Sequence, residues 1–319
     1  MNSPKKVLLV GLGGIGFQYD LDNFDLLKPS QCHEPQTHYG AAVQNAHNVI
    51  GGVDLDRLAR DNFEKVTSLK SWRSINDFNG SEEVDILVVA TPTSTHLEQF
   101  IHACTILKPR AVLFEKPFGM SAKESKEMIG LSKEFQIPII VNYSRNFSKG
   151  FDLIRKIVAD EGFESGHVLY GQGLRENGSH FLRLIIELFG APLKIALNSE
   201  KYTSQNPSFT MFFANSKSIV FSGSDIENIR LGEIYLETST SAIRISEGMQ
   251  YEIYSITKGS KPLPWLRDLL MTSQGDLSGG MSQLYCDTSW TNTESFSACI
   301  QRNHLDMECN RIIDDFLLA

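Results

Sequence analysis

Two short segments of the chain hold the side chains best suited to moving a proton and stabilising negative charge. The first reads Glu115-Lys116-Pro117 and follows an apolar run typical of a buried strand. A lysine at the end of a strand could donate a hydrogen bond to a substrate hydroxyl and stabilise the alkoxide that develops as hydride leaves. A structural ion pair between Glu115 and Lys116 is the other interpretation of this segment.

The second segment reads Asn177-Gly178-Ser179-His180 and leads into a predicted helix. Because His180 falls in the first helical turn, the positive end of the helix dipole disfavours the imidazolium and keeps a neutral base available. Most single histidines in a fold are structural, but the flexible Asn-Gly-Ser approach favours a functional interpretation. We therefore consider His180 a candidate general base.

A glycine-rich turn follows the first apolar run of the chain. Residues 7–10 are followed by Gly11-Leu12-Gly13-Gly14-Ile15-Gly16, a complete G-x-G-x-x-G pattern. The first glycine permits the tight bend, the second lets the backbone approach a pyrophosphate, and the third lets helix and strand pack closely. Phosphate groups then lie against amides at the start of the following helix. Directly after a strand, this pattern predicts a dinucleotide site formed by Gly11, Gly13, Gly14, Ile15 and Gly16 rather than a merely structural turn.

Asp54 bears on the choice of cofactor, because it directly follows a second apolar run, residues 49–53. A carboxylate at this place accepts hydrogen bonds from ribose hydroxyls and repels a 2′-phosphate, so it favours NAD over NADP. Arg57 could reverse that preference, but Asp56 stands beside it. An aspartate that merely ends a turn is the other interpretation.

The distance between the glycine turn and Asp54 departs from the usual pattern. Asp54 follows Gly16 by 38 residues, where about 20 is usual. The excess lies in residues 17–37, a segment rich in Asp, Pro and polar residues. We interpret it as an insertion that forms either a lid beside the cofactor or a surface loop.

Cys32, His33 and His38 lie in or beside this insertion and invite a zinc interpretation. No second thiol or acidic cluster accompanies them in the sequence, and hydride transfer needs no metal. We therefore expect no metal site.

The order of the predicted elements in the first half indicates a parallel sheet. Short apolar runs rich in β-branched residues predict strands buried on both faces at residues 7–10, 49–53, 84–90, 111–114 and 137–141. Helix-like segments alternate with these runs, which is typical of βαβ units in a doubly wound Rossmann sheet. Such sheets bind ligands at the carboxyl ends of their strands, where the motifs of this half fall.

The second half differs, because strand-like stretches follow one another closely. Helices are expected at residues 148–160, 180–189 and 295–318, and strands at residues 209–214, 219–222, 233–238, 242–245 and 251–256. Several of these stretches alternate apolar and polar residues, which favours an open, mainly antiparallel sheet. The sequence therefore predicts an α/β protein with a Rossmann domain over residues 1–146 and a second α/β domain over residues 147–319.

Composition excludes several partners. The formal charge is −8 for 319 residues, so the basic face that nucleic acid or an anionic membrane needs is not expected. No apolar run is long enough to span a membrane. The five cysteines are scattered without a Cys-x-x-Cys pair, and no cleavage site follows the first apolar run, which predicts a protein of the reducing cytoplasm.

Taken together, these motifs resemble the Gfo/Idh/MocA family, named for glucose–fructose oxidoreductase, inositol dehydrogenase and rhizopine catabolism. The resemblance covers most of the chain, through the glycine turn, Asp54, Thr91-Pro92 with His96 downstream, Glu115-Lys116-Pro117 and Asn177-Gly178-Ser179-His180. It implies that Lys116 and His180 form the catalytic pair. It also implies that the glycines, Asp54, Thr91 and Pro92 line the cofactor, and we place His96 and Glu115 in the same site. Finally, it implies a homodimer or homotetramer that pairs through the C-terminal sheet.

The chain departs from the family pattern at Asn177, where many members carry an aspartate. Asparagine can orient a hydroxyl but cannot take a proton. Arg145, Arg175 and Arg183 lie in the same region and suit a carboxylate or phosphate on a substrate. The other interpretation is that these arginines are solvent-exposed or paired with acidic residues.

The predicted function is NAD(P)-dependent hydride transfer to or from a secondary alcohol of a sugar, with a nucleotide-activated or acidic sugar as the candidate substrate. The resemblance to the family's enzymes of surface-polysaccharide sugar pathways also favours such a substrate. One alternative is an NAD-dependent lyase or hydrolase of a glycosidic substrate, in which oxidation is transient. Another is a dinucleotide-binding sensor without catalysis.

Overall fold

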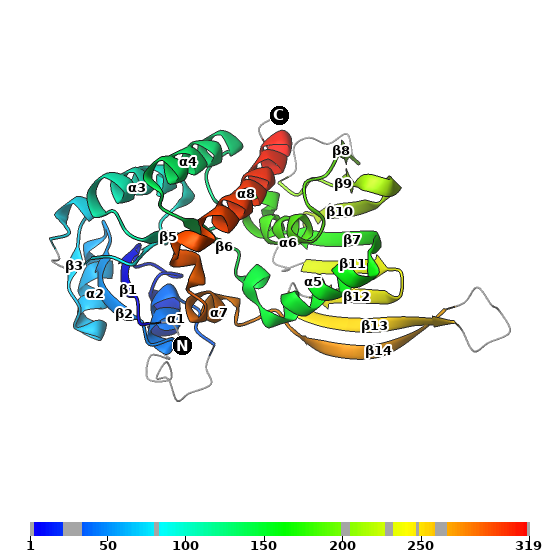
Figure 1. The fold of residues 1–319 in the computed structure, drawn as a ribbon, viewed down its shortest axis with the longest axis horizontal. Helices are drawn as coiled ribbons and strands as arrows, with labels where there is room; N and C mark the ends of the chain where they lie inside the picture. The colour runs from blue at the N-terminus through cyan, green and yellow to red at the C-terminus, as the bar shows by residue number, and fades with distance from the viewer. Residues whose placement is uncertain are drawn as a thin grey trace. The chain divides into compact units, whose positions relative to one another are not determined.

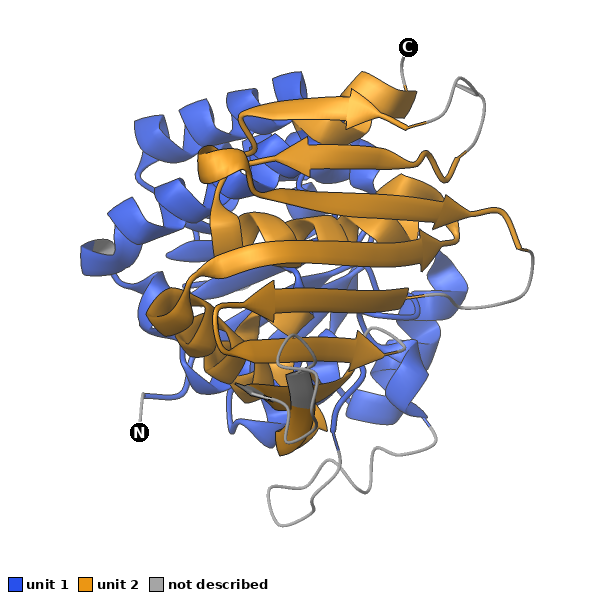
Figure 2. Ribbon diagram, turned by 90° about the vertical axis from the view of Figure 1, so that its right-hand side faces the viewer, with its two compact units in different colours: residues 1–144, 281–310 blue, residues 145–280, 311–319 orange. Residues whose placement is uncertain are grey.

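The computed structural model describes residues 3–21, 34–79, 83–198, 205–226, 232–246, 249–258 and 267–317. The chain folds into two compact units (Figure 2). Unit 1 comprises residues 1–144 and 281–310, and unit 2 comprises residues 145–280 and 311–319. The sequence places the boundary after residue 146 and assigns everything beyond it to the second domain, whereas in the structure residues 281–310 belong to unit 1.

Buried side chains explain why residues 281–310 belong to unit 1. Trp290 and Cys299 are buried, and Ile300 and Met307 pack against the hydrophobic core of this unit. Removing apolar surface from water is the dominant favourable contribution to folding. The sequence contains no linker that would indicate this return of the chain.

Unit 1 is built on a six-stranded parallel sheet in the order β3-β2-β1-β4-β5-β6 (Figure 1). Its strands are β1 (Lys6–Val10), β2 (Asn48–Val53), β3 (Ser71–Trp72), β4 (Ile86–Val89), β5 (Ala111–Glu115) and β6 (Ile139–Asn142). Every residue of β4 and β6 is buried, as expected for strands covered on both faces. This sheet confirms the predicted doubly wound Rossmann fold.

Some helices of unit 1 begin at a side-chain cap, supplied by Thr37, Asp56 or Ser121. The helices of this unit are α1 (His38–Gln44), α2 (Arg57–Thr67), α3 (His96–His102), α4 (Ala122–Phe135), α7 (Gly280–Cys286) and α8 (Phe296–Leu317), the last of which ends in unit 2. Ser121 and Glu124 have the spacing of a capping box, and the Ser121 hydroxyl accepts from the Glu124 amide at the start of α4. Thr95 and Glu98 have the same spacing, which predicts a cap at Thr95, but this prediction is wrong. A 3₁₀ turn leads into α3, and the Thr95 hydroxyl donates to the Pro92 carbonyl instead.

Unit 2 contains an eight-stranded sheet in the order β14-β13-β12-β11-β7-β10-β9-β8 (Figure 1). Its strands are β7 (Phe163–Gly171), β8 (Lys194–Leu197), β9 (Phe209–Phe212), β10 (Ser218–Ser224), β11 (Gly232–Thr238), β12 (Ser241–Ser246), β13 (Gln250–Lys258) and β14 (Arg267–Asp276). All neighbours pair antiparallel except β7 and β10, which are parallel. The predicted open, mainly antiparallel sheet is therefore confirmed.

Helices α5 (Lys149–Glu161) and α6 (Ser179–Phe189) cover one face of this sheet. A Cβ added at Gly150 of α5 would meet the ring of Tyr251 in β13, and one added at Gly232 in β11 would meet the ring of Phe181 in α6. Figure 2 shows the other face, over which no helix of the described part of unit 2 lies. Among the described helices, none combines the length and apolar character that a membrane span requires.

Candidate active site

The glycine turn lies at the carboxyl end of β1. A different structural reason accounts for glycine at each of its positions. Gly11 has a φ of +96°, and a Cβ there would lie 2.5 Å from the Ala90 carbonyl oxygen. A Cβ at Gly16 would run into the carbonyl oxygen of Gly11. Nothing lies within 4 Å of the place that a Cβ of Gly13 would take. Gly11 and Gly16 are therefore required by the fold, whereas Gly13 leaves its backbone open to a ligand.

Backbone amides of this turn are available to an anion. The Gly11 amide donates to the Val53 carbonyl and the Leu12 amide to Asp54 Oδ2. The amides of Gly13, Gly14 and Ile15 have no acceptor among the residues that the structure describes. Successive amides of this kind form a concavity that binds phosphate.

The insertion at residues 17–37 separates the glycine turn from the first helix, and this changes which backbone amides are available to a phosphate. Up to residue 21, where the described segment ends, the chain after the glycines forms turns, with the Phe17 amide donating to the Gly13 carbonyl, and α1 begins at His38. The amides of the turn itself are therefore the candidate groups for a phosphate, in place of the start of a long first helix. The ends of the insertion are joined by buried Asp20, which accepts from the Gln36 amide and from the amide and hydroxyl of Thr37.

The described residues do not settle whether the insertion is a lid, because residues 22–33 lie outside them. Cys32 and His33 of the zinc hypothesis fall in that gap. His38 lies in the described part, and its two ring nitrogens already contact Tyr285 and Glu115. These two hydrogen bonds do not favour His38 as a metal ligand.

A cavity of about 460 Å³ opens at the carboxyl edge of the parallel sheet. Its lining includes the predicted cofactor residues Gly11, Gly13, Asp54, Thr91 and Pro92. Asp54 Oδ2 accepts from the Leu12 amide at 2.7 Å and Oδ1 from the Asp56 amide at 2.9 Å. Asp54 therefore fixes the turn and also presents its carboxylate to the cavity.

The basic residue of this cavity is not the one that the sequence suggested. Arg57 is 83% exposed, pairs with Asp61 at 3.6 Å and does not line the cavity. Arg73 does line it, directly after Trp72 at the end of β3. Because β3 has only two residues, no periodic pattern marked it in the sequence, and Arg73 was missed.

His96 lies behind the cavity rather than in its lining. It is fully buried, with Nε2 3.1 Å from the Thr91 carbonyl oxygen and Nδ1 3.4 Å from that of Phe118. Burial lowers the pKa of His96, and the two carbonyls and the charge of Glu115 oppose this effect only in part. A neutral His96 thus supports the loop at Thr91, and the structure does not give it the predicted contact with the cofactor cavity.

Glu115 is the centre of a buried hydrogen-bond network. Its Oε1 lies 2.9 Å from His38 Nε2 and accepts from Asn142 Nδ2 at 2.6 Å, while its Oε2 accepts from the Lys116 amide at 3.2 Å. Burial acts to raise the pKa of Glu115, but the hydrogen bonds from His38, Asn142 and the Lys116 amide outweigh it and hold the pKa below its ordinary value. Glu115 is therefore ionised and supports Lys116, which is half-buried at the end of β5.

His180 belongs to unit 2, whereas Lys116 belongs to unit 1. A π-helical turn, Gly173–Gly178, runs directly into α6, of which His180 is the second residue. The helical backbone therefore begins before His180, and the predicted effect of a free helix end on its imidazole is not supported. Asn177 closes this turn, because its Nδ2 donates to the Gly171 carbonyl at 3.1 Å. Single π-helical turns are frequent at functional sites.

The three candidate arginines have partners within unit 2. Arg183 is 1% exposed and donates to Glu187 at 2.6 Å, and Arg175 donates to Asp314 at 3.2 Å. Arg145 Nε lies 3.4 Å from the sulfur of Met249, and its guanidinium lies over the ring of Phe181. Arg183 is thus a buried structural residue, and the structure gives no support to its predicted contact with substrate.

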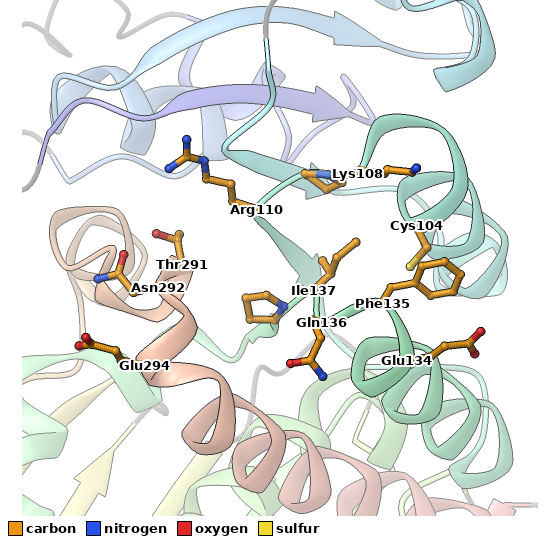
Figure 3. Close-up of a pocket in the computed structure, with 12 residues that line it drawn as sticks. Cys104, Lys108, Arg110, Glu134, Phe135, Gln136, Ile137, Thr291, Asn292 and Glu294 are labelled. Atoms are coloured by element: carbon orange, nitrogen blue, oxygen red, sulfur yellow. The ribbon is translucent and has the colours of Figure 1, made fainter.

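A larger cavity, of about 790 Å³, lies at the opposite end of the parallel sheet (Figure 3). Arg110 and Ile137 on its wall lie at the amino ends of β5 and β6. The side chains of Arg110 and Lys108 point away from each other in Figure 3. Sheets of this type bind ligands at the carboxyl ends of their strands, so the smaller cavity is the cofactor candidate.

The parallel sheet, the glycine turn and Asp54 together define a dinucleotide-binding Rossmann domain. Residues 5–143 match the family described as oxidoreductase family, NAD-binding Rossmann fold (Gfo/Idh/MocA). The match covers less than half of the 319 residues, and it confirms the resemblance found in the sequence.

A relative by sequence is an uncharacterized oxidoreductase of Streptococcus pneumoniae serotype 4, which is 30% identical over 137 residues. The matched region covers 42% of this chain and 36% of that protein. The chain thus spans about a third of the length of the curated relatives that it matches.

Solved structures share the fold over a longer stretch. UDP-N-acetylglucosamine 3-dehydrogenase GnnA from Acidithiobacillus ferrooxidans has a TM-score of 0.71 at 13% identity, covering 98% of this chain and 99% of that chain. The WlbA dehydrogenase from Chromobacterium violaceum, in complex with NADH and UDP-GlcNAcA, has a TM-score of 0.61 at 16% identity, covering 76% of this chain and 74% of that chain. At these identities the likeness shows the fold.

Proposed function

We propose that the protein is an NAD-dependent oxidoreductase that transfers hydride to or from a secondary alcohol of a sugar. The observation that carries this proposal is the cavity that the glycine turn and Asp54 share, beside turn amides with no acceptor in the described chain. These groups would hold the pyrophosphate and a ribose of a nicotinamide dinucleotide, which supplies the hydride acceptor. Asp54 prefers ribose hydroxyls and so favours NAD over NADP, while Arg73 in the same cavity acts in the opposite direction.

Lys116 and His180 are the proposed catalytic residues. Lys116 stabilises negative charge that develops on the alcohol oxygen, and His180 accepts or returns its proton. The Asn177 amide is engaged with the Gly171 carbonyl and cannot take a proton. Proton transfer in this proposal therefore rests on His180 and Lys116.

The proposed substrate is a nucleotide-activated or acidic sugar. The support is the likeness in fold to GnnA and to the WlbA complex with NADH and UDP-GlcNAcA. Because Arg175 and Arg183 have acidic partners, the proposal assigns neither of them to the anionic group of the substrate. Arg145 is the arginine of this region that we retain for that role.

We also propose that the protein is a homodimer or homotetramer that pairs through the uncovered face of the eight-stranded sheet. Exposed Tyr235 and the ion pair of Arg244 with Glu233 lie on strands of this sheet. Light scattering of the wild type and of Tyr235→Glu tests this proposal. Equal masses for both proteins, at the value of one chain, would refute it.

The experiment that tests the function begins with fluorescence titrations of NADH and NADPH, followed by absorbance assays with UDP-sugars and sugar acids. Lys116→Met should bind NADH within twofold of the wild type and lose turnover by about 10²-fold or more. Lys133→Met, at an exposed position in α4, is the matched control. Turnover of Lys116→Met within a few-fold of the wild type would remove Lys116 from the mechanism.

The outcome of the assays separates the alternatives. A steady change at the nicotinamide band supports net oxidation. Product formed without that change supports the lyase or hydrolase reaction with transient oxidation. Binding of NADH without any turnover supports a sensor, and no binding by folded protein free of retained cofactor refutes the dinucleotide site.

A further inference from the structure

A row of hydrogen bonds connects the C-terminal segment of unit 1 with Glu115. The Tyr285 hydroxyl in α7 lies 3.0 Å from His38 Nδ1 in α1, and His38 Nε2 lies 2.9 Å from Glu115 Oε1 at the end of β5. Tyr285 and His38 are fully buried. The three residues belong to elements far apart in the sequence, and all lie within unit 1.

One arrangement of protons gives every group in this row a partner. Burial and the charge of Glu115 raise the pKa of Tyr285 well above its ordinary value, so the phenol keeps its proton. Its hydroxyl can then donate to His38 Nδ1, which leaves the other ring proton on Nε2 to donate to Glu115. In this tautomer His38 joins a phenol donor to a carboxylate acceptor without an unsatisfied ring nitrogen.

The carboxylate of Glu115 is thereby fixed by three donors that come from three different segments of the chain. His38 and Asn142 donate to Oε1, and the amide of Lys116 donates to Oε2. The last contact links the carboxylate directly to the backbone from which the Lys116 side chain extends. A displacement of a catalytic group by about 1 Å can lower the reaction rate by about 10²-fold.

We propose that Tyr285 and His38 are positioning residues that hold Glu115 against the Lys116 amide and so fix the lysine for catalysis. The site of unit 1 is then incomplete without residues 281–310, which supply Tyr285. This inference rests on the proposed role of Lys116. It adds two residues that act by positioning the lysine and take no part in the chemical step.

Three variants test the proposal in the full-length protein. Tyr285→Phe removes only the first donor and should lower kcat by about tenfold, with KM and the NADH Kd within twofold. His38→Ala breaks the row and should lower kcat by about 10²-fold. His38→Gln should recover part of that loss, because its amide can accept from Tyr285 and donate to Glu115.

His47→Gln is the matched control. His47 Nε2 contacts the backbone carbonyl of Tyr285 at 2.7 Å, so it anchors the same segment without touching Glu115. This variant should lose thermal stability and keep its kcat within twofold. An equal fall of kcat in His47→Gln and Tyr285→Phe would show that docking of the segment alone matters, and would overturn the proposal.

A second measurement keeps the proposal testable if the wild type turns over no sugar, which is the failure of the proposed function. Trinitrobenzenesulfonate modifies lysines, and peptide mass spectrometry gives the rate at Lys116 relative to exposed Lys133. Tyr285→Phe and His38→Ala should change the relative rate at Lys116 several-fold, and His47→Gln should not. Unchanged rates in folded Tyr285→Phe and His38→Ala would overturn the proposal, whatever the assays show.

Discussion

Asp54 and Arg73 lie at the carboxyl ends of neighbouring parallel strands, and both line the cofactor cavity. The Asp54 amide donates to the carbonyl of Trp72, the residue before Arg73, at 3.0 Å. A carboxylate that favours ribose hydroxyls thus stands beside a guanidinium that suits a 2′-phosphate. We expect the balance between these two groups, rather than Asp54 alone, to determine the preference of the cavity between NAD and NADP.

This pairing predicts the behaviour of Asp54→Asn. The amide keeps an acceptor for the Leu12 backbone but removes the charge that repels a 2′-phosphate, so the ratio of NADPH to NADH affinity should rise about tenfold. Adding Arg73→Gln should cancel the gain. Arg57→Gln, whose side chain lies outside the cavity, should leave the ratio unchanged. Fluorescence titrations of the wild type and the three variants measure this ratio. A gain in the ratio that persists in the double variant would show that Arg73 does not contact the 2′-phosphate.

Replacing Gly13 or Gly16 of the glycine turn by alanine should have different effects on the melting temperature and on NADH binding. Gly13→Ala should leave the melting temperature unchanged, because nothing lies within 4 Å of the added Cβ, and should weaken NADH binding about tenfold or more by blocking approach to the backbone. Gly16→Ala should instead lower the melting temperature, since its Cβ runs into the Gly11 carbonyl. If Gly13→Ala binds NADH like the wild type, the pyrophosphate is not held at this turn.

The sequence predicts best those features that buried β-branched runs and glycines determine locally. The strand expected at residues 7–10 is Lys6–Val10, and the helix expected at residues 148–160 is Lys149–Glu161. Features that depend on distant contacts were missed. His38 and Tyr285 stand 247 residues apart, and no local pattern can indicate that they touch.

The same limit explains the errors in the candidate site. Arginine spacing suggested a binding surface at Arg183, but the spacing of four residues to Glu187 also forms a helical ion pair, which the structure shows to be buried. His180 was judged from the start of its α-helix, while the preceding π-helical turn has no distinct sequence signal.

The buried pair of Arg183 and Glu187 leads to a prediction about stability. Arg183→Met leaves the Glu187 carboxylate, which is 15% exposed, without its closest cation, and this should cost about 3 kcal/mol of unfolding free energy. Arg183→Met with Glu187→Met should recover most of the loss, because no buried charge then remains. Urea unfolding measures both. KM for the sugar should stay within twofold, and a large rise in KM at unchanged stability would restore Arg183 to the substrate site.

Buried His96 makes stability depend on pH in a direction that can be derived. Burial lowers its folded-state pKa below the ordinary value of 6.5, so as pH falls below 6.5 the unfolded chain takes up a proton that the folded chain does not. The unfolding free energy should therefore decrease with falling pH, by at most about 1.4 kcal/mol per pH unit from this group. His96→Gln should have a flatter profile between about pH 6.5 and 5.5, where most carboxylates are still ionised. His167→Gln, at an exposed strand position, is the control in urea unfolding at each pH. A wild-type slope in His96→Gln would mean that His96 is not the neutral support of the Thr91 loop.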